Sequence, residues 1–292
     1  MLKRSVLVLG AASWNKMVFV SSLPQGESAT IFEAHEREAV GSTGVGKAMA
    51  LAAMGCAPVL HCALGKDDNG QLVKKACQER DISLIIDEHD EPTPHHLNIM
   101  DDHGGRYSIF ISNGAENPSL NMARLKHAIC SAGTVFLCLC ASSKIALPLL
   151  RESQAEVLLD LHDYDGTNPW YNDFIACADI IQLSDVALEN PLKVVERFLS
   201  GRAHQVVLTS GAKGAEIFTA SQRVFIEPVK AKIIDSNGAG DAFSVGLWYA
   251  QKQGKNLKDA GNFAAATAAF AIEDDALFPS DLAIEDILKR TS

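Results

Sequence analysis

Short, almost continuously apolar segments alternate with helix-length segments along most of the chain, and this alternation constrains the fold most strongly. The apolar segments predict strands at residues 6–10, 57–65, 82–86, 134–140, 156–161, 178–183 and 204–209. The segments between and after them predict helices at residues 44–56, 71–80, 145–152, 191–200, 239–253, 257–271 and 281–290. Strands that are apolar on both faces and alternate with helices form a mainly parallel sheet covered on both sides, so we predict an α/β protein.

Two segments depart from this pattern. Residues 29–40 (ATIFEAHEREAV) mix apolar and polar side chains as a half-buried strand does, and residues 95–111 predict a hairpin with HGG at its turn. Both segments suit a small β-rich appendage on the main domain. The chain contains no linker rich in Pro, Gly and Ser, so we predict one domain over residues 1–292.

The composition argues against several classes of protein. The net charge of −10 disfavours nucleic acids and anionic membranes as partners. No segment approaches the roughly 18 apolar residues of a membrane span, and residues 6–9 fit a first strand better than a signal peptide. Seven cysteines without a C-x-x-C motif predict free thiols in a reducing compartment. We therefore expect a cytoplasmic protein.

Residues 233–250 (IIDSNGAGDAFSVGLWYA) predict an anion-binding turn. A strand is expected to end at Asp235, small residues follow, and a helix begins near Asp241. Free N–H groups at a helix start can hold a phosphate. From the first helical turn, the Asp241 carboxylate can accept a proton from a hydroxyl that attacks a phosphoryl group. The same pattern also fits an ordinary Gly-rich turn with an N-capping Asp.

A second glycine-rich segment, GSTGVGKA (residues 41–48), nearly matches the phosphate-binding P-loop. Ala48 stands where Ser or Thr should bind magnesium, and the preceding residues do not form a buried strand. Lys47 would meet phosphates only if this segment were a P-loop. A P-loop NTPase therefore stays as an alternative, but we favour residues 233–250 as the phosphate site.

The segment DSNGAGD (residues 235–241) closely matches the D-[TS]-x-G-A-G-D signature of the ribokinase-like carbohydrate kinases of the phosphofructokinase-B type. The chain resembles this family along nearly its whole length, in the segments at residues 6–28, 41–56, 63–73, 158–170 and 206–218. The resemblance implies a three-layer α/β/α fold with a mainly parallel central sheet and a small β-sheet lid, contributed by residues 13–42 and 94–112. It also implies phosphoryl transfer from ATP, with Mg²⁺ and optionally a monovalent cation, and a homodimer formed through the lid.

The resemblance assigns roles to particular residues. Asp241 is expected to be the general base, and the N–H groups of Asn237, Gly238, Ala239 and Gly240 are expected to hold the transferred phosphoryl group. The nucleotide is expected to lie beside Thr209, Gly211, Gly214 and Asp235. The acceptor is expected to lie against Asn15, Ser42, Thr43 and Gly46. That acceptor would be a sugar, with a nucleoside as the alternative.

Several positions depart from the family pattern. Asn15 replaces an Asp that binds sugar hydroxyls, Ser42 replaces a Gly, and Gly46 replaces an Asn. The N-x-x-E motif that organises Mg²⁺ would align with Ser184 and Ala187, so the metal ligands stay unknown, with Asp185 and Glu189 as substitutes. These departures leave the acceptor open. They also keep a non-catalytic binding protein of the same fold as an alternative.

Overall fold

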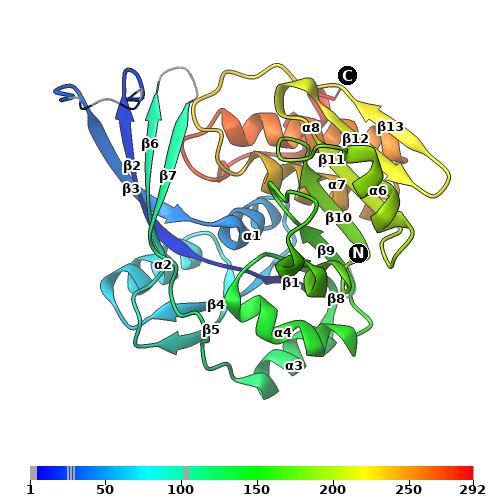
Figure 1. Ribbon diagram of the computed structural model, residues 1–292, viewed down its shortest axis with the longest axis horizontal. Helices are drawn as coiled ribbons and strands as arrows, with labels where there is room; N and C mark the ends of the chain where they lie inside the picture. Colours follow the sequence, from blue (N-terminus) through cyan, green and yellow to red (C-terminus); the bar gives the residue numbers. More distant parts are fainter. Residues whose placement is uncertain (1–4, 25, 27, 29, 102–104, 292) are drawn as a thin grey trace.

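A large parallel sheet forms the centre of the protein (Figure 1). The computed structural model describes residues 5–24, 26, 28, 30–101 and 105–291. Within these residues the sheet has the order β13-β12-β11-β10-β9-β8-β1-β4-β5, and only β12 runs antiparallel to its neighbours. The strands are β1 (Ser5–Leu9), β4 (Val59–Gly65), β5 (Ser83–His89), β8 (Ala132–Leu137), β9 (Glu156–Asp160), β10 (Ile180–Ser184), β11 (Gln205–Thr209), β12 (Ala215–Thr219) and β13 (Arg223–Ile226).

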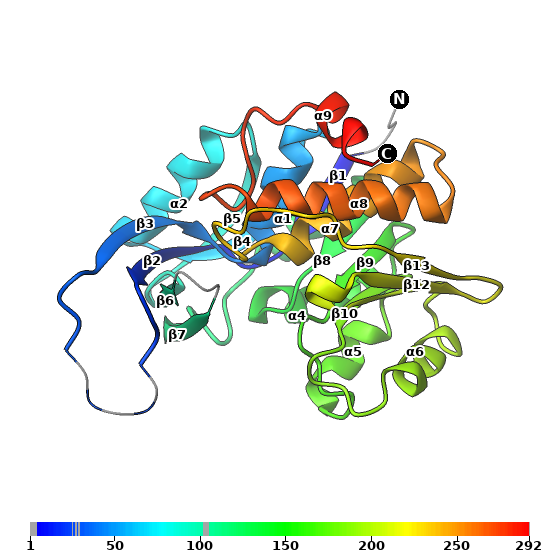
Figure 2. The same cartoon turned by 90° about the horizontal axis from the view of Figure 1, so that it is seen from above.

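Helices cover both faces of this sheet, as Figure 2 shows from above. One face carries α1 (Thr43–Ala53), α2 (Asp68–Gln78), α7 (Ala239–Lys252), α8 (Leu257–Ile272) and α9 (Ile284–Lys289). The other carries α3 (Met122–Ser131), α4 (Ala141–Arg151), α5 (Asn172–Ile175) and α6 (Pro191–Leu199). The predicted three-layer α/β/α arrangement is confirmed. Among the described residues, no helix is long and apolar enough to cross a membrane.

Alternate residues of the central strands supply two separate apolar cores. In β1, Val6 and Val8 pack in the core beneath α1, α7 and α8, whereas Leu7 and Leu9 pack in the core beneath α3, α4 and α6. Fully burying such a side chain contributes about 1.5–3 kcal/mol, so both helical layers stabilise the same strand. This two-sided burial is the reason why the strands are almost continuously apolar in the sequence.

A second, four-stranded sheet, which we call the lid, projects from one end of the main sheet (Figure 1). Its order is β3-β2-β6-β7, with β2 (Ser13–Val20), β3 (His35–Gly41), β6 (His95–Asp101) and β7 (Arg106–Ser112). All four strands fall within the two segments predicted for it, and β6 and β7 form the predicted hairpin. His103 and its neighbours at the predicted turn lie outside the described residues.

Three features of the fold differ from the predictions. The strand expected at residues 29–40 begins only at His35 and is mostly exposed, because it is an edge strand of the lid. Helix α3 was not predicted, although Asn121 caps it by accepting a hydrogen bond from Arg124 N at 3.0 Å. The antiparallel pair β12 and β13 was also missed. Its strands are short and close the edge of the main sheet.

Candidate active site

The segment at residues 41–48 is not a P-loop. Strand β3 ends at Gly41 and pairs antiparallel with β2 in the lid, whereas a P-loop follows a buried parallel strand. Lys47 is 1% exposed, and its ammonium contacts the carboxylates of Asp160 and Asp241 rather than an open phosphate site. The P-loop alternative is therefore wrong, and α1 instead packs against α7 and supports its first turn.

The DSNGAGD segment forms the turn that begins α7. The strand predicted to end at Asp235 is absent from this described segment, and Ile233 and Ile234 are about half exposed. The turn is held by backbone bonds from residues 234 and 235 to Ile272 O. Gly238 caps the helix with a φ of 80°, a conformation that other residues rarely adopt.

Part of the predicted anion site is open and part is occupied. The backbone N–H and side-chain amide of Asn237 both donate to Asp235 Oδ1, at 2.8 Å and 2.7 Å. The N–H groups of Gly238, Ala239 and Gly240 stand at the helix start, where no intrahelical acceptor exists. Three adjacent amides at the positive end of α7 can therefore hold an anion.

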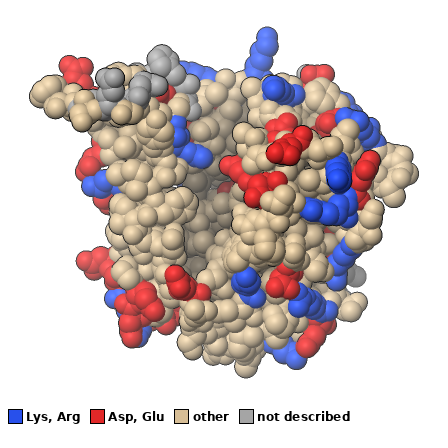
Figure 3. Space-filling model, viewed as in Figure 1, with Lys and Arg blue, Asp and Glu red and all other residues tan. Residues whose placement is uncertain are grey.

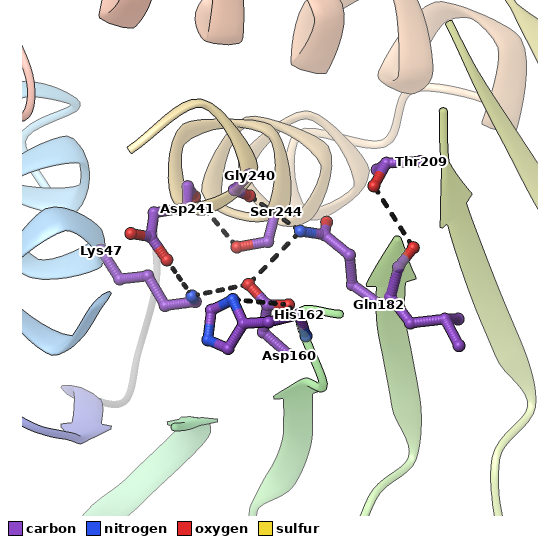
Figure 4. A network of polar contacts seen from close by, with 9 residues as sticks. Lys47, Asp160, His162, Gln182, Thr209, Gly240, Asp241 and Ser244 are labelled. Atoms are coloured by element: carbon purple, nitrogen blue, oxygen red, sulfur yellow. Dashed lines mark hydrogen bonds and ion pairs between the residues drawn. The ribbon is translucent and has the colours of Figure 1, made fainter. Parts of the chain in front are cut away.

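Asp241 belongs to a buried polar network that the sequence did not predict (Figure 4). Lys47 Nζ from α1 contacts Asp241 Oδ1 and lies 3.0 Å from Asp160 Oδ2 at the end of β9. Gln182 of β10 donates to Gly240 O at 2.8 Å, which ties the same helix start to the main sheet. His162 lies beside Asp160, with Nδ1 3.6 Å from its carboxylate. Four separate segments thus meet around one carboxylate of α7.

Burial and ion pairing act in opposite directions in this network. Burial raises the pKa of the Asp241 carboxyl above its ordinary value, and Lys47 offsets only part of that rise. Burial also disfavours the charge of Asp160, but His162 and Lys47 outweigh it and bring the pKa of Asp160 down to about 2. Burial alone would lower the pKa of Lys47, but the two carboxylates keep it above its ordinary value. Of the two carboxylates, Asp241 is therefore the one whose protonated form is favoured.

Three of the four residues predicted to border the nucleotide lie where β11 ends and β12 begins, whereas Asp235 lies in the turn before α7. Thr209 ends β11 and donates to Leu183 O at 3.3 Å. Gly211 begins the short 3₁₀ turn Gly211–Lys213, and Gly214 follows its last residue. Asp160 ends β9 in the same sheet, so these residues and the Asp241 network share the edge where parallel α/β sheets bind ligands.

The positions that replace the N-x-x-E motif offer little for a metal. Ser184 ends β10, Ala187 is exposed, and Asp185 accepts a hydrogen bond from the Ser210 hydroxyl at 2.6 Å. Among the described residues, no three His, Cys, Asp or Glu side chains are grouped to hold a metal ion. A single carboxylate such as that of Asp185 still fits Mg²⁺, because Mg²⁺ at nucleotide sites needs only one or two protein carboxylates besides phosphates and water.

A cavity of about 700 Å³ lies between the lid and the main sheet. Figure 3 shows this face of the molecule hollowed beside the lid. Its lining comes from the lid, the start of α1, the start of α4 and the segment before α5, and includes Ser42, His96, Phe110, Cys140, Lys144 and Trp170. Burial lowers the pKa of His96 to about 4, so this ring is neutral near pH 7. No sequence motif marked Cys140 or Lys144, because the cavity forms only where distant segments meet.

The predicted acceptor residues lie at different depths. Ser42 lines the cavity. Asn15 is buried at its edge, where its Oδ1 accepts a hydrogen bond from His96 N at 3.3 Å. Thr43 begins α1, and Gly46 lies one turn further along, where a Cβ would be 2.7 Å from Asp241 Oδ2. The start of α1 therefore connects the cavity with the Asp241 carboxylate.

Two lid arginines reach the turn before α7. Arg106 donates a hydrogen bond to Asn237 Oδ1, and an Arg37 guanidinium nitrogen lies 3.6 Å from Asp235 Oδ2. Arg37 also lies 3.8 Å from Asp275. The lid thus brings positive charge to the turn that presents the free amides.

Comparisons with known proteins agree with this geometry. The family model of the pfkB family carbohydrate kinases matches residues 4–277. The acarbose 7(IV)-phosphotransferase of Actinoplanes sp. is 28% identical over 272 residues, which cover 91% of each chain. Ribokinase of Arabidopsis thaliana is 24% identical over 97% of this chain and 80% of its own. The structure of the microbiome-derived acarbose kinase Mak1 superposes with a TM-score of 0.88 at 26% identity, covering 99% of both chains.

Proposed function

Because the chain belongs to the pfkB family of carbohydrate kinases, we propose that it phosphorylates a hydroxyl of a sugar or sugar-like molecule, with Asp241 as general base. The family that the DSNGAGD signature predicted is confirmed, and with it the ribokinase-like fold and the class of ATP-dependent phosphotransferase. The observation that carries the proposed role of Asp241 is its position. It stands in the first turn of α7, directly after three amides without intrahelical acceptors.

The proposed reaction uses these groups in one step. Asp241 accepts the proton of the acceptor hydroxyl, and the oxygen attacks the γ-phosphorus of ATP. A new bond forms between that oxygen and the γ-phosphorus, while the bond to the β–γ bridging oxygen breaks and ADP leaves. The N–H groups of Gly238, Ala239 and Gly240 stabilise the negative charge on the transferred group. Arg106 adds a cation beside the same turn.

The nucleotide is proposed to lie along the ends of β10 and β11, beside Thr209, Gly211 and Gly214, with Asp235 next to its phosphates. Mg²⁺ bound to these phosphates would neutralise part of their charge. We propose Asp185 and Glu189 as the carboxylates that would help to hold it, because Ser184 and Ala187 carry none.

The size and lining of the cavity support an acceptor with more than one sugar ring. Its volume of about 700 Å³ lies well inside the range of roughly 300–1,000 Å³ seen for binding sites of drug-sized ligands. Phe110 and Trp170 offer aromatic faces to the C–H faces of sugar rings, and Lys144 and Ser42 offer hydrogen bonds to hydroxyls. The similarity to two acarbose kinases makes a pseudo-oligosaccharide the first candidate.

A product screen tests this function. The protein is incubated with ATP and Mg²⁺ and with acarbose, maltotriose, ribose or inosine, and products are identified by mass spectrometry. Phosphorylation of an oligosaccharide that is lost in Asp241→Asn supports the proposal. Phosphorylation of inosine alone would support the nucleoside alternative. Calorimetric binding of ATP without any phosphorylated product would favour a non-catalytic binding protein.

The lid also supports the proposed homodimer. Strand β7 is an outer strand of the lid, and Tyr107, Ile109 and Ile111, which alternate onto one face of it, are each 46–61% exposed. An exposed apolar edge strand is a surface that proteins usually cover. A parent protein that sediments as a dimer and an Ile109→Lys variant that sediments as a monomer would support pairing through this strand. An Ile109→Lys variant with the same mass as the parent protein would reject it.

A further inference from the structure

The buried ammonium of Lys47 is the feature of the site that the proposed reaction does not yet use. Its side chain is 1% exposed, and the side chains of its two partners, Asp160 and Asp241, are 4% and 7% exposed. A buried cation is costly unless ion pairs compensate it, and a single lysine here serves two carboxylates. The three groups carry a net charge of −1 when all are ionised.

The neighbouring residue makes this contact possible. Gly46 has no side chain, and a Cβ there would approach Asp241 Oδ2 to 2.7 Å. The Asp241 carboxylate therefore rests directly against the backbone of α1, with one oxygen over Gly46 and the other on Lys47 Nζ. Both oxygens are thus positioned by α1, which also supplies Ser42 to the cavity.

We propose that Lys47 is a positioning residue for phosphoryl transfer: its ammonium, anchored by Asp160, holds the Asp241 carboxylate ionised and in one orientation toward the acceptor. This inference rests on the proposed role of Asp241. Without Lys47, two carboxylates would face each other in a buried site, and they would share a proton as paired acids do. With Lys47, Asp241 stays a free base while remaining nearly buried.

The other groups around this pair do not replace Lys47. On the side of β8, Cys138 faces the lysine, but burial raises its pKa to about 12, so the thiol is neutral. Beyond β9, His162 lies beside Asp160 and its side chain is 38% exposed. From β10, Gln182 offers a neutral amide, and on α7 the Ser244 hydroxyl donates to Asp241 O rather than to its carboxylate. Lys47 is therefore the fully buried cation of the network among the described residues.

A titration of the carboxylates by NMR tests the inference without any substrate. Asp→Asn variants assign the carboxyl signals of protein labelled at its aspartates. In Asp160→Asn only Asp241 titrates within the pair, so comparison with Lys47→Met/Asp160→Asn isolates the effect of the lysine. Removing a contacting opposite charge is expected to raise the apparent pKa of Asp241 by about 1–3 pH units. An unchanged pKa would overturn the proposal. In Asp160→Asn, Lys47 still pairs with Asp241. The two compared variants both lack the Asp160 carboxylate, so the comparison does not require that the single variant Lys47→Met folds.

Activity supplies the second measurement, with acarbose as the acceptor probe. In Lys47→Met, the acidic limb of the pH profile of kcat/KM is expected to move to higher pH, and kcat is expected to fall more than KM rises. In Asp160→Asn, the same limb is expected to move to lower pH. The exposed Lys193→Met on α6 is the control for loss of a positive charge. If Asp241→Asn keeps full turnover, the proposed function itself fails. If Asp241→Asn is inactive but neither of the other variants moves the pH profile, only the role of Lys47 fails.

Discussion

Arg106 of the lid donates a hydrogen bond to Asn237, in the turn that presents the free amides of α7. This contact joins β7 to the phosphate end of the site across 131 residues of sequence. It places a guanidinium, which suits phosphate oxygens, where the transferred group is proposed to lie. The lid therefore has a chemical role in the proposed reaction besides covering the cavity.

Replacing Arg106 with Ala tests that role. Loss of one hydrogen bond from a charged group is expected to lower kcat/KM by about tenfold to a hundredfold, since such bonds contribute about 1.5–3 kcal/mol. The melting temperature is expected to change little, because Arg106 is exposed. Steady-state kinetics with ATP and acarbose measure the effect. Arg223→Ala, which removes an exposed arginine paired with Glu216 on β12, is the matched control. Equal kinetics in both variants would contradict the role.

Gly46 leads to a second prediction, because a methyl group at this position would displace the Asp241 carboxylate. In Gly46→Ala, a shift of the base by a fraction of an ångström to 1 Å is expected to lower kcat by up to about a hundredfold. Binding of ATP, measured by calorimetry, is expected to change little, since the predicted nucleotide residues lie on β11 and beyond. A variant with normal kcat would show that the base tolerates displacement.

The pH dependence of stability gives a third prediction, at His61 and Asp87. His61 of β4 is fully buried, its Nε2 lies 3.0 Å from Asp87 Oδ2, and its Nδ1 has no partner among the described residues. Burial lowers the pKa of His61, and Asp87 offsets this only in part. Below about pH 6.5, His61 therefore binds a proton in the unfolded chain but stays neutral in the folded protein. The free energy of unfolding falls as the pH falls.

The expected loss between pH 7 and pH 5 from this histidine is on the order of 1 kcal/mol in the free energy of unfolding. Urea unfolding at several pH values measures it. The matched variant is His61→Gln, which keeps a donor for Asp87 but cannot titrate, so its stability should depend less on pH in this range. A His61→Gln curve parallel to that of the parent protein would show that other groups cause the dependence.

The parts of this structure that were predictable are those with local signals. The buried strands, the hairpin of the lid and the helix that follows DSNGAGD all follow from periodicity and turn residues. The β-branched pair Ile233 and Ile234 was misread as a strand, because propensity alone does not show that no neighbouring strand is available. The partners of Lys47 had no local signal: Asp160 lies 113 residues away and Asp241 lies 194 residues away. Only the completed sheet brings them together.

Trp170 supplies the last prediction, which concerns the size of the acceptor. Its ring lines the cavity and is 38% exposed, so it can contact a sugar ring of the acceptor beside Lys144, whose Nζ lies 4.9 Å from the ring centroid. In Trp170→Ala, the KM for acarbose is expected to rise about fivefold, from loss of roughly 1 kcal/mol of aromatic contact, while the KM for ATP stays unchanged. The exposed Leu192→Ala on α6 serves as the control. If Trp170 contacts a second ring of the acceptor, an acceptor of one ring should show no change, and equal effects on one-ring and multi-ring acceptors would argue against an extended acceptor site.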